Sequence, residues 1–346
     1  MKERKRIKII VAMSGGVDSS VAAAILKREN FDVKGIFMKL ADLPKFKKSE
    51  KMAKKIAKVL RIPFLTLGLR KEFKKRVIDC FLKEYKRGIT PNPCVVCNKE
   101  IKFGLLLEKT LALDADYIAT GHYVRLKKEN LRYKLLKSKD KEKDQSYFLW
   151  QLNQSQLKHI LFPVGDLTKK EVRKLAKKFK LPVFDASESM EACFVPKTIN
   201  DFLEKHLQKK PGNIINTEGK IIGRHQGLFF YTIGQRKGIR LPGGPYYVLD
   251  KDFKKNILII TKNEKDLYKN ELTAKNINWI SGEKPKLPLK IKAKIRYRQE
   301  PALATLKIRD KKNIKVMFDK SQRAITSGQS VVFYQGQKIL GGGIIN

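Results

Sequence analysis

Short apolar runs alternate with longer segments of helical periodicity in the first part of the chain. The runs are compact and rich in β-forming residues, which is typical of strands buried on both faces of a parallel sheet. They lie at Ile7–Ala12, Phe31–Met38, Phe64–Leu67 and Tyr117–Thr120. The intervening segments repeat apolar residues at helical spacing and lie at Val17–Arg28, Ser49–Leu60, Lys71–Lys86 and Cys97–Leu113. This alternation predicts an α/β domain with a doubly wound parallel sheet.

The pattern changes after about Thr198. Glycine and proline become frequent, as in Leu241–Pro245, and short alternating runs follow that are typical of small antiparallel β-barrels. These runs lie at Tyr246–Leu249, Ile257–Thr261, Leu289–Arg296, Ala302–Ile308, Ile314–Phe318 and Ser330–Tyr334. We therefore expect an α/β domain over residues 1–198 and two small, mainly β domains over 199–267 and 268–346, the last a β-barrel.

Composition changes this picture mainly in its electrostatics. The 346 residues include 76 Lys and Arg against 34 Asp and Glu, which gives a formal net charge of +42. Such a surface attracts polyanions through phosphate neutralisation and counterion release. A general bias of the source proteome toward lysine produces the same excess, so charge alone does not establish a nucleic-acid partner.

The expected cellular compartment is inferred from three features: apolar segment length, the N-terminal stretch and the number of cysteines. No stretch approaches the roughly 18 apolar residues needed to span a bilayer, and the apolar run after the basic opening is too short for a signal peptide. The 4 cysteines are too few for a disulfide-stapled secreted fold. We therefore expect a cytoplasmic protein with reduced thiols and no membrane partner.

The most specific local motif is AMSGGVDSS, residues Ala12–Ser20, between the first strand and the first helix. Its glycines let backbone amides approach phosphate oxygens, and the helix N-terminus adds unpaired N–H groups. The serines supply hydroxyl donors, and Asp18 is placed to hold Mg²⁺ between phosphates. The lysine of the Walker pattern is missing, which favours a pyrophosphate leaving group bound mainly by backbone. The alternative is an ordinary strand–helix turn with a serine N-cap.

Further stretches complete a family resemblance. They are Thr90–Phe103 (TPNPCVVCNKEIKF), Ala119–Tyr123 (ATGHY), Lys143–Leu149 (KDQSYFL), Tyr231–Gly238 (YTIGQRKG) and Leu340–Ile345 (LGGGII). SGGVDSS resembles the PP-loop of N-type ATP pyrophosphatases, and all the stretches together resemble the bacterial tRNA-specific 2-thiouridylases nearly end to end. The resemblance implies adenylation, by ATP with Mg²⁺, of the wobble uridine in the anticodon loop of tRNAs for lysine, glutamate and glutamine. Its 2-oxygen is then replaced by sulfur.

The resemblance also implies two sets of binding residues. The ATP set is Ala12, Met13, Ser14, Gly15, Gly16, Val17, Asp18, Ser19, Met38 and Gly121. The tRNA set is His122, Lys143, Asp144, Gln145, Arg296, Tyr297 and Gln329. Simpler interpretations stand beside these: Met38 as core, His122 as a neutral hydrogen-bonding residue, and Lys137–Lys143 as a solvated run of charge. The glycine-flanked turn Gly234–Gly238 is basic and suits a phosphate backbone.

Thiolation requires a sulfur carrier, and nearby lysines or a helix N-terminus can lower the pKa of a nucleophilic thiol. Cys97 lies where a helix is expected to begin, with Lys99 and Lys102 nearby, and Cys193 lies in a loop-like stretch, 187–195. The resemblance implies that Cys193 carries a persulfide received from a donor protein, a cysteine desulfurase or a relay protein. Cys97 is then the second catalytic thiol, and it could release the sulfur by forming a disulfide with Cys193.

Cys94 leaves an alternative open. Cys94, Cys97 and Cys193 could hold an iron–sulfur cluster, [4Fe-4S], with one open iron that binds external sulfide. Zinc is a further interpretation of C-x-x-C, but the chain has no second such pair. The chain could also be another PP-loop adenylating synthetase, which has no use for distant paired cysteines, or an RNA-binding protein with a decayed nucleotide site. The segment 40–52 looks short and weakly acidic for the family, which predicts a simplified donor interface.

Overall fold

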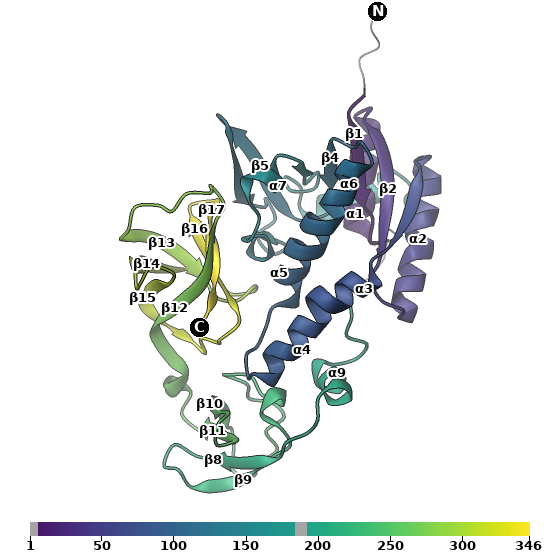
Figure 1. Cartoon of the computed structure of the whole chain (residues 1–346). Coiled ribbons are helices and arrows are strands. Elements are labelled where there is room, and N and C mark those ends of the chain that lie inside the picture. Colours follow the sequence, from purple (N-terminus) through teal and green to yellow (C-terminus); the bar gives the residue numbers. More distant parts are fainter. Residues whose placement is uncertain (1–5, 184–191) are drawn as a thin grey trace, which may run out of the picture.

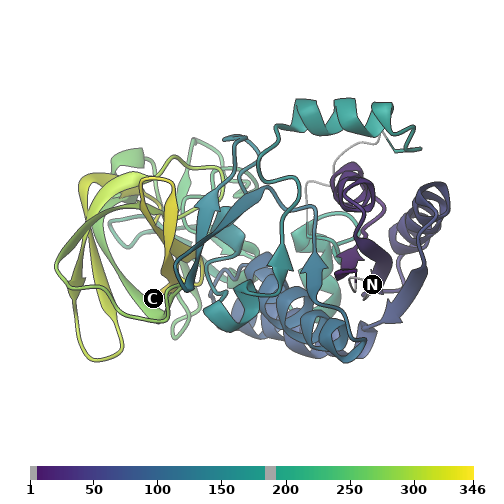
Figure 2. The same ribbon diagram turned by 90° about the horizontal axis from the view of Figure 1, so that it is seen from above.

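The computed structural model describes residues 6–183 and 192–346. An α/β part, a small β-rich part and a β-barrel follow one another along the chain and lie against one another (Figure 1). Seen from above, the barrel and the parallel sheet with its helices form opposite ends of the molecule (Figure 2). Throughout the described ranges, every helix is too short or too polar to cross a lipid bilayer.

The N-terminal part is built on a parallel sheet with the order β3-β2-β1-β4-β7. Its strands are β1 Lys8–Ala12, β2 Asp32–Lys39, β3 Phe64–Gly68, β4 Tyr117–Ala119 and β7 Ile160–Leu161. The order reverses at β1, so the crevice beyond the carboxyl ends of β1 and β4 is the place where such sheets bind ligands. The expected doubly wound parallel sheet is confirmed.

Helices cover both faces of this sheet. On one face Ile9 and Val11 of β1 pack in a cluster with α1 Val17–Arg28, α2 Pro44–Leu60 and α8 Lys169–Lys178. On the other face Ile10 packs with residues of η2 Asn98–Leu105 and α6 Leu106–Ala112. The alternation of neighbouring strand residues between the two faces explains why the strands read as continuous apolar runs.

Two expected helices contain π-helical stretches. The expected helix Lys71–Lys86 forms as α3 Arg70–Phe73, η1 Lys74–Ile78 and α4 Asp79–Lys86. The helix expected from Cys97 begins earlier, and it forms as α5 Pro93–Cys97, η2 and α6. The π-helices η1 and η2 contact each other, and π-helical turns occur frequently at functional sites.

The C-terminal part is a closed barrel in the order β12-β15-β14-β13-β16-β17, and a β12–β17 pairing closes it. Its strands are β12 Tyr268–Trp279, β13 Leu289–Lys294, β14 Ala302–Ile308, β15 Ile314–Arg323, β16 Ser330–Gln335 and β17 Lys338–Ile345. The hairpin β5 Val124–Glu129 and β6 Arg132–Lys137 extends this sheet by pairing β6 with β17. The expected C-terminal barrel is confirmed, and the hairpin that joins it to the α/β part was not foreseen.

The middle part is a sheet with the order β10-β11-β8-β9. Its strands are β8 Gly212–Ile215, β9 Ile221–His225, β10 Tyr247–Asp252 and β11 Ile257–Thr261. The β11–β8 pairing is parallel, so the expectation of a purely antiparallel region is wrong here. The short elements that complete the chain are η3 Ser146–Phe148, α7 Gln154–Leu157, α9 Ile199–His206, η4 Leu228–Phe230 and η5 Glu264–Leu267.

Candidate active site

The loop between β1 and α1 is held in shape by its own side chains. The Ser14 N–H donates to the Ser19 hydroxyl at 3.1 Å, and that hydroxyl lies 3.2 Å from the Gly16 carbonyl oxygen. Gly15 has a φ of +79°, and a Cβ there would collide with the Ser49 carbonyl of α2. Only glycine fits this position, because both the backbone angle and the space exclude a side chain. The first amides of α1 are thus presented in a preformed loop.

The remaining residues of the expected ATP set surround this loop. A Cβ on Gly121, just after β4, would lie 2.5 Å from the Ser19 amide nitrogen, so β4 ends directly against the first turn of α1. Met13 and Val17 are buried in the core, so only their backbone faces the loop. Met38 is half-buried and packs against the apolar clusters that contain Val95 and Cys97.

Asp18 is engaged by two side chains that were not among the expected ATP residues. Its Oδ1 atom accepts a hydrogen bond from the Tyr123 hydroxyl at 2.7 Å and lies 2.6 Å from the Lys169 Nζ atom. Lys169 stands in the first turn of α8, and its side chain is only 13% exposed. The sequence held a signal for this helix start, because Thr168-x-x-Glu171 is a capping box.

Segments far apart in the sequence bring the thiols within electrostatic reach of one another and of Lys102. We call this group of side chains the thiol pocket (Cys94, Cys97, Lys102, His122 and Cys193). Cys97 ends α5, a short helix whose N-cap Asn92 accepts from the Val95 N–H. Cys193 lies in a turn closed by the Val195 N–H donating to the Ala192 carbonyl at 3.0 Å.

The turn around Cys193 is anchored by the residues that follow it. Phe194 packs edge-on against Phe73, Phe81 and Phe202, in the same apolar cluster as Cys97. Lys45 donates to the Val195 carbonyl at 2.8 Å. Lys45 comes from the segment 40–52, so that segment supports the turn that holds Cys193. The preceding residues 187–191 of the loop-like stretch lie outside the described residues.

Burial governs the acidity of the thiols. It raises the pKa of Cys97 to about 12, whereas the Lys102 ammonium lowers it by a smaller amount. The pKa values of Cys94 and Cys193 are also raised, again by burial first, and Lys102 opposes the shift in each. The expected lowering by lysine is therefore present, but it is outweighed, and the resting thiols are protonated at neutral pH. Cys94 and Cys193 still keep exposed surface, whereas Cys97 is buried.

Lys102 links the thiols to His122. Its Nζ atom lies 3.4 Å from His122 Nε2, and His122 Nδ1 lies 2.8 Å from the Thr120 hydroxyl. Burial and the Lys102 charge hold the pKa of His122 well below its usual range. The imidazole is therefore neutral, with Nε2 accepting from the ammonium and Nδ1 donating to Thr120. This agrees with the neutral hydrogen-bonding residue expected from the sequence, and tRNA contact by His122 stays a prediction.

The described residues of the thiol pocket form no site for a single metal ion. Across residues 6–183 and 192–346, no three His, Cys, Asp or Glu side chains are grouped so that they could hold a metal ion. Cys94, Cys97 and Cys193 lie close enough for their charges to affect one another's pKa values.

The expected tRNA residues 143–145 lie in a loop tied to the phosphate loop. Asp144 is 6% exposed, and its carboxylate accepts from the Ser138 N–H at 3.1 Å and the Ser146 hydroxyl at 2.8 Å. Gln145 Oε1 accepts from the Tyr123 N–H at 3.0 Å. The Asp144 side chain thus orders the loop from inside, and Lys143 begins the same turn, its N–H donating to Asp140 at 3.1 Å.

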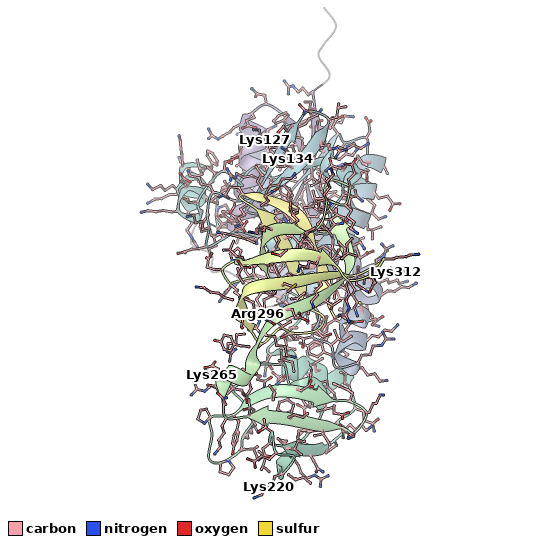
Figure 3. All side chains as sticks on the ribbon, turned by 90° about the vertical axis from the view of Figure 1, so that its left-hand side faces the viewer. Lys127, Lys134, Lys220, Lys265, Arg296 and Lys312 are labelled. Atoms are coloured by element: carbon pink, nitrogen blue, oxygen red, sulfur yellow. The ribbon has the colours of Figure 1, made fainter. Side chains whose placement is uncertain are left out.

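Of the expected tRNA residues of the barrel, Tyr297 and Gln329 contact the α/β part. Arg296 donates to the Ala324 carbonyl at 2.6 Å, and the Tyr297 ring lies 4.5 Å from the Phe148 ring between centroids. Gln329 donates to the Thr90 carbonyl at 2.8 Å, in the segment that leads to α5. Figure 3 views the barrel side, where Arg296 lies between labelled lysines of the β5–β6 hairpin above and of the middle part below.

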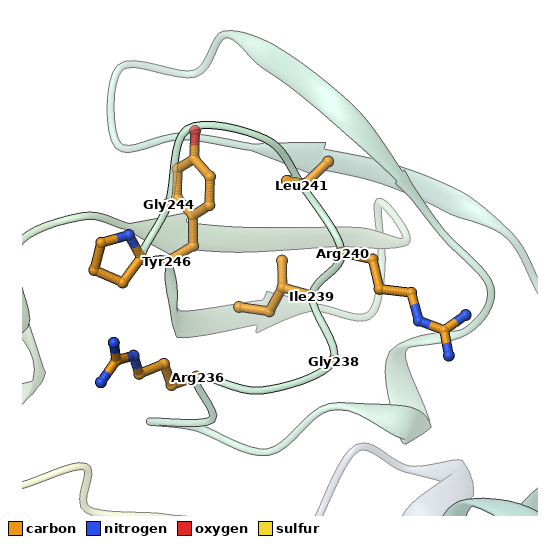
Figure 4. A pocket seen from close by; sticks show the side chains of 8 residues that line it. Arg236, Gly238, Ile239, Arg240, Leu241, Gly244 and Tyr246 are labelled. Carbon is orange, nitrogen blue, oxygen red and sulfur yellow. The ribbon is translucent and has the colours of Figure 1, made fainter.

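The basic turn of the middle part borders a shallow cavity of about 400 Å³. Arg236 and Arg240 come from the loop that lines it, and their side chains extend to opposite sides of that loop (Figure 4). Tyr246 closes another side of the cavity. Two guanidinium groups beside an aromatic ring suit phosphate and an unstacked base.

A glycine-serine loop at the switch point of a parallel sheet, with a pocket of thiols beside it, defines a PP-loop nucleotide-binding enzyme class. Family models match the whole succession of domains. Those described as tRNA methyl transferase HUP domain, tRNA methyl transferase PRC-barrel domain and Aminomethyltransferase beta-barrel domain match residues 7–197, 200–262 and 269–345.

Full-length relatives narrow the class. The tRNA-specific 2-thiouridylase MnmA of Buchnera aphidicola subsp. Acyrthosiphon pisum is 46% identical over 358 residues, which cover 99% of this chain and 97% of the relative. The tRNA-specific 2-thiouridylase MnmA of Clostridium acetobutylicum is 44% identical and covers 98% of this chain and 99% of its own length. The chain belongs to the family of tRNA-specific 2-thiouridylases, which confirms the resemblance inferred from the motifs.

Similarity to solved structures is lower. The U34-tRNA thiolase NcsA from Methanococcus maripaludis with its [4Fe-4S] cluster is 20% identical, with a TM-score of 0.38 over 54% of this chain and 60% of that chain. A score this low supports no inference about this chain.

Proposed function

We propose that this protein is an ATP-dependent sulfurtransferase that converts the wobble uridine of tRNA into 2-thiouridine. One observation carries the proposal: the short segment after β4 touches both halves of the site. Gly121 lies against the first turn of α1, and the next residue, His122, contacts Lys102 beside the thiols. A base bound at this segment lies between the phosphates and the sulfur.

The first step is adenylation. The uridine 2-oxygen attacks the α-phosphorus of ATP, the bond to the bridging oxygen breaks, and pyrophosphate leaves as the uridine loses its N3 proton. The amides at the start of α1, with Ser14 and Ser19, would bind the phosphates. Asp18 would hold Mg²⁺, because this ion is usually bound by one or two carboxylates together with substrate phosphates and water.

The second step is sulfur transfer, for which we propose a persulfide on Cys193. The terminal sulfur attacks carbon 2 of the activated uridine, and AMP leaves with its oxygen. The Cys97 thiolate then attacks the inner sulfur of Cys193, which forms a Cys97–Cys193 disulfide and leaves the second sulfur on the base. An external thiol reduces the disulfide, and a cysteine desulfurase or relay protein reloads Cys193.

We prefer the persulfide to the [4Fe-4S] alternative because Cys97 lies close enough to Cys193 to be affected by its charge, as a disulfide between the two requires. The persulfide route also needs an accessible thiol to receive sulfur, and Cys193 is exposed. Cys193 keeps exposed surface on which a donor protein could dock.

We infer that the other two domains, with boundaries near Thr198 and Leu267, hold the tRNA. The proposed contacts are His122, Lys143, Asp144, Gln145, Arg296, Tyr297 and Gln329, with the basic cavity of the middle part beside them. Asp144 would act by shaping its loop, because its carboxylate is buried. The anticodon loop suits this arrangement, since a wobble base leaves its stack more readily than a paired base.

The test is an anaerobic reaction of the full chain with ATP, Mg²⁺, unmodified tRNA and a persulfide-loaded desulfurase. We expect 2-thiouridine by mass spectrometry and equal amounts of AMP and pyrophosphate, with iron absent from the active enzyme. If turnover requires stoichiometric iron and inorganic sulfide, the persulfide route is wrong. If AMP forms with an ammonia donor and an amidated product instead of 2-thiouridine, the chain is another PP-loop synthetase.

A further inference from the structure

An ion pair lies beside the phosphate loop and joins two helices. The Lys169 Nζ atom, from α8, is 2.6 Å from the Asp18 carboxylate in the first turn of α1. The side chains are 13% and 32% exposed, so the ammonium is largely enclosed while the carboxylate stays accessible. The Lys169 ammonium also lies over the Tyr123 ring, 5.8 Å from its centroid.

The backbone of Lys169 is fixed from two directions. Its N–H donates to Asp140 Oδ2 at 2.8 Å, and the preceding residue, Thr168, caps α8 together with Glu171. Lys139 pairs with Glu171 at 2.8 Å and holds the same helix end to the 138–144 loop. The long lysine side chain is therefore carried by a rigid base, and its tip can move without disturbing the helix.

A lysine is electrostatically unfavourable in the first turn of a helix, where the macrodipole favours anions. Its position is explained by what it faces. The same tip of Lys169 that reaches Asp18 lies beside the loop formed by Ser14–Ser19, which binds phosphates in the proposed function. This loop lacks the lysine that the Walker pattern places after its last glycine, and Lys169 brings an ammonium to the loop from another helix.

We propose that Lys169 is a catalytic residue that binds the β- and γ-phosphates of ATP and the departing pyrophosphate, with Asp18 as its partner in the resting enzyme. Asp18 would hold Mg²⁺ together with the substrate phosphates, and the Lys169 ammonium beside it would then pair with the triphosphate instead of the carboxylate. During adenylation the bond between the α-phosphorus and the bridging oxygen breaks, and that oxygen keeps the electron pair. Lys169 stabilises the new negative charge by ion pairing, and no proton is transferred.

The inference rests on the proposed function but is tested separately from it. The variant Lys169→Met keeps most of the side-chain volume and removes the charge, and Lys169→Arg keeps the charge. Lys170→Met is the matched control, because Lys170 is the next residue of the same helix and is exposed. The readouts are tRNA-dependent AMP formation, the affinities for Mg-ATP and for inorganic pyrophosphate by calorimetry, and the thermal midpoint.

We expect Lys169→Met to lower kcat for AMP formation by about 10²-fold, as the loss of a transition-state contact to a developing charge does, with the KM for tRNA unchanged. Its affinity for pyrophosphate should fall about tenfold, Lys169→Arg should recover most of both losses, and Lys170→Met should match the wild type.

The inference is overturned if Lys169→Met binds pyrophosphate and forms AMP as the wild type does, even where its thermal midpoint falls, since Lys169 then only neutralises Asp18. Failure of the proposed function looks different: the wild-type protein itself would form no 2-thiouridine.

Discussion

The phosphate loop and the thiol pocket lie side by side but are built in opposite ways. The phosphate loop is local, since residues between Ser14 and Ser19 hold its shape, and its carboxylate is already paired with a cation. The thiol pocket is assembled from segments far apart in the sequence, and its ammonium, Lys102, faces a neutral imidazole and protonated thiols. The phosphate loop is therefore shaped to bind an anion before any ligand arrives, whereas the thiol pocket holds its nucleophiles in the protonated, inactive form.

This difference suggests that the two half-reactions are separable. Burial raises the pKa of Cys97 to about 12, so sulfur chemistry requires a change in the pocket before a thiolate can form. The phosphate loop instead binds through backbone amides and serine hydroxyls, which need no ionisation. Changes in one region should therefore leave the chemistry of the other nearly intact.

The largest effect is expected from Cys97→Ser and Cys193→Ser. Each should reduce 2-thiouridine formation by at least about 10³-fold, because each removes a nucleophile or leaving group of the sulfur step. AMP formation with tRNA in a single turnover should stay within about threefold of the wild type, since the phosphate loop is untouched. Cys80→Ser is the control, because Cys80 lies on α4 outside the thiol pocket. A parallel loss of AMP formation would show that the two regions are coupled.

The reverse separation is tested by Gly121→Ala. A Cβ there would lie 2.5 Å from the Ser19 amide nitrogen, so β4 or the first turn of α1 has to move. We expect AMP formation to fall by about 10²-fold, as a small misplacement of reacting groups can cause. The rate of Cys193 alkylation should not change. Gly68→Ala is the control, since a Cβ there meets no atom within 4 Å; equal losses in both variants would point to general destabilisation.

The same contrast explains what could be predicted from the sequence. The parallel sheet and α1 were found because their signals, buried apolar runs and helical periodicity, are local. α2 begins at Pro44 instead of Ser49, because proline fits the first turn of a helix. The β5–β6 hairpin and β12 were not predicted. Apolar and polar residues alternate only weakly along these strands, and β6 and β12 also pair with strands far away in the sequence.

The site divides in the same way. Loop residues such as Gly15 and Asp18 could be identified from the motif alone. The contact from Lys169 to Asp18 depends on how α8 packs beside α1, which no local pattern encodes. Gln329 was predicted as a tRNA contact, and in the structure its amide holds the Thr90 carbonyl. Its role toward tRNA stays a prediction.

An intermediate effect is expected from Lys102→Met. The Lys102 ammonium stabilises the thiolates of the pocket, so its removal should raise their pKa values further. We expect iodoacetamide to alkylate Cys193 about threefold to tenfold more slowly near pH 8, because the thiolate fraction falls with the increase in pKa. The difference should shrink above the thiol pKa values, where both proteins are ionised.

Lys99→Met is the control for Lys102→Met, because Lys99 lies 3.6 Å from Glu100 and is not among the charges that act on the thiols. ATP binding should be unchanged in both variants. If Lys99→Met slows alkylation equally, the effect comes from overall charge and not from the thiol pocket.

The smallest effect concerns the chain segment that leads from α4 to α5. Lys251 of β10 donates to the Gly88 carbonyl at 2.8 Å and the Tyr231 carbonyl at 2.9 Å, so it ties the middle part to this segment. Burial lowers the pKa of Lys251 to about 8, although Asp250 opposes this decrease. We expect Lys251→Met to reduce thiolation by no more than about threefold and to leave ATP binding unchanged. Within the described residues, Lys251 contacts neither the phosphate loop nor the thiols, so it can act on them only indirectly.

The pH dependence of stability distinguishes this role. Between about pH 8 and 10.5 the unfolded chain keeps the Lys251 proton that the folded chain has released, so wild-type stability rises with pH relative to Lys251→Met. Within this window the free energy of unfolding gains on the order of 1 kcal/mol as the pH rises by about one, and below the folded pKa the difference is constant. The free energy of unfolding is measured for both proteins by denaturation across this window. The difference between them removes the contribution of the other lysines, which titrate in both. Parallel curves would mean that Lys251 is solvated and does not tie the middle part to the segment between α4 and α5.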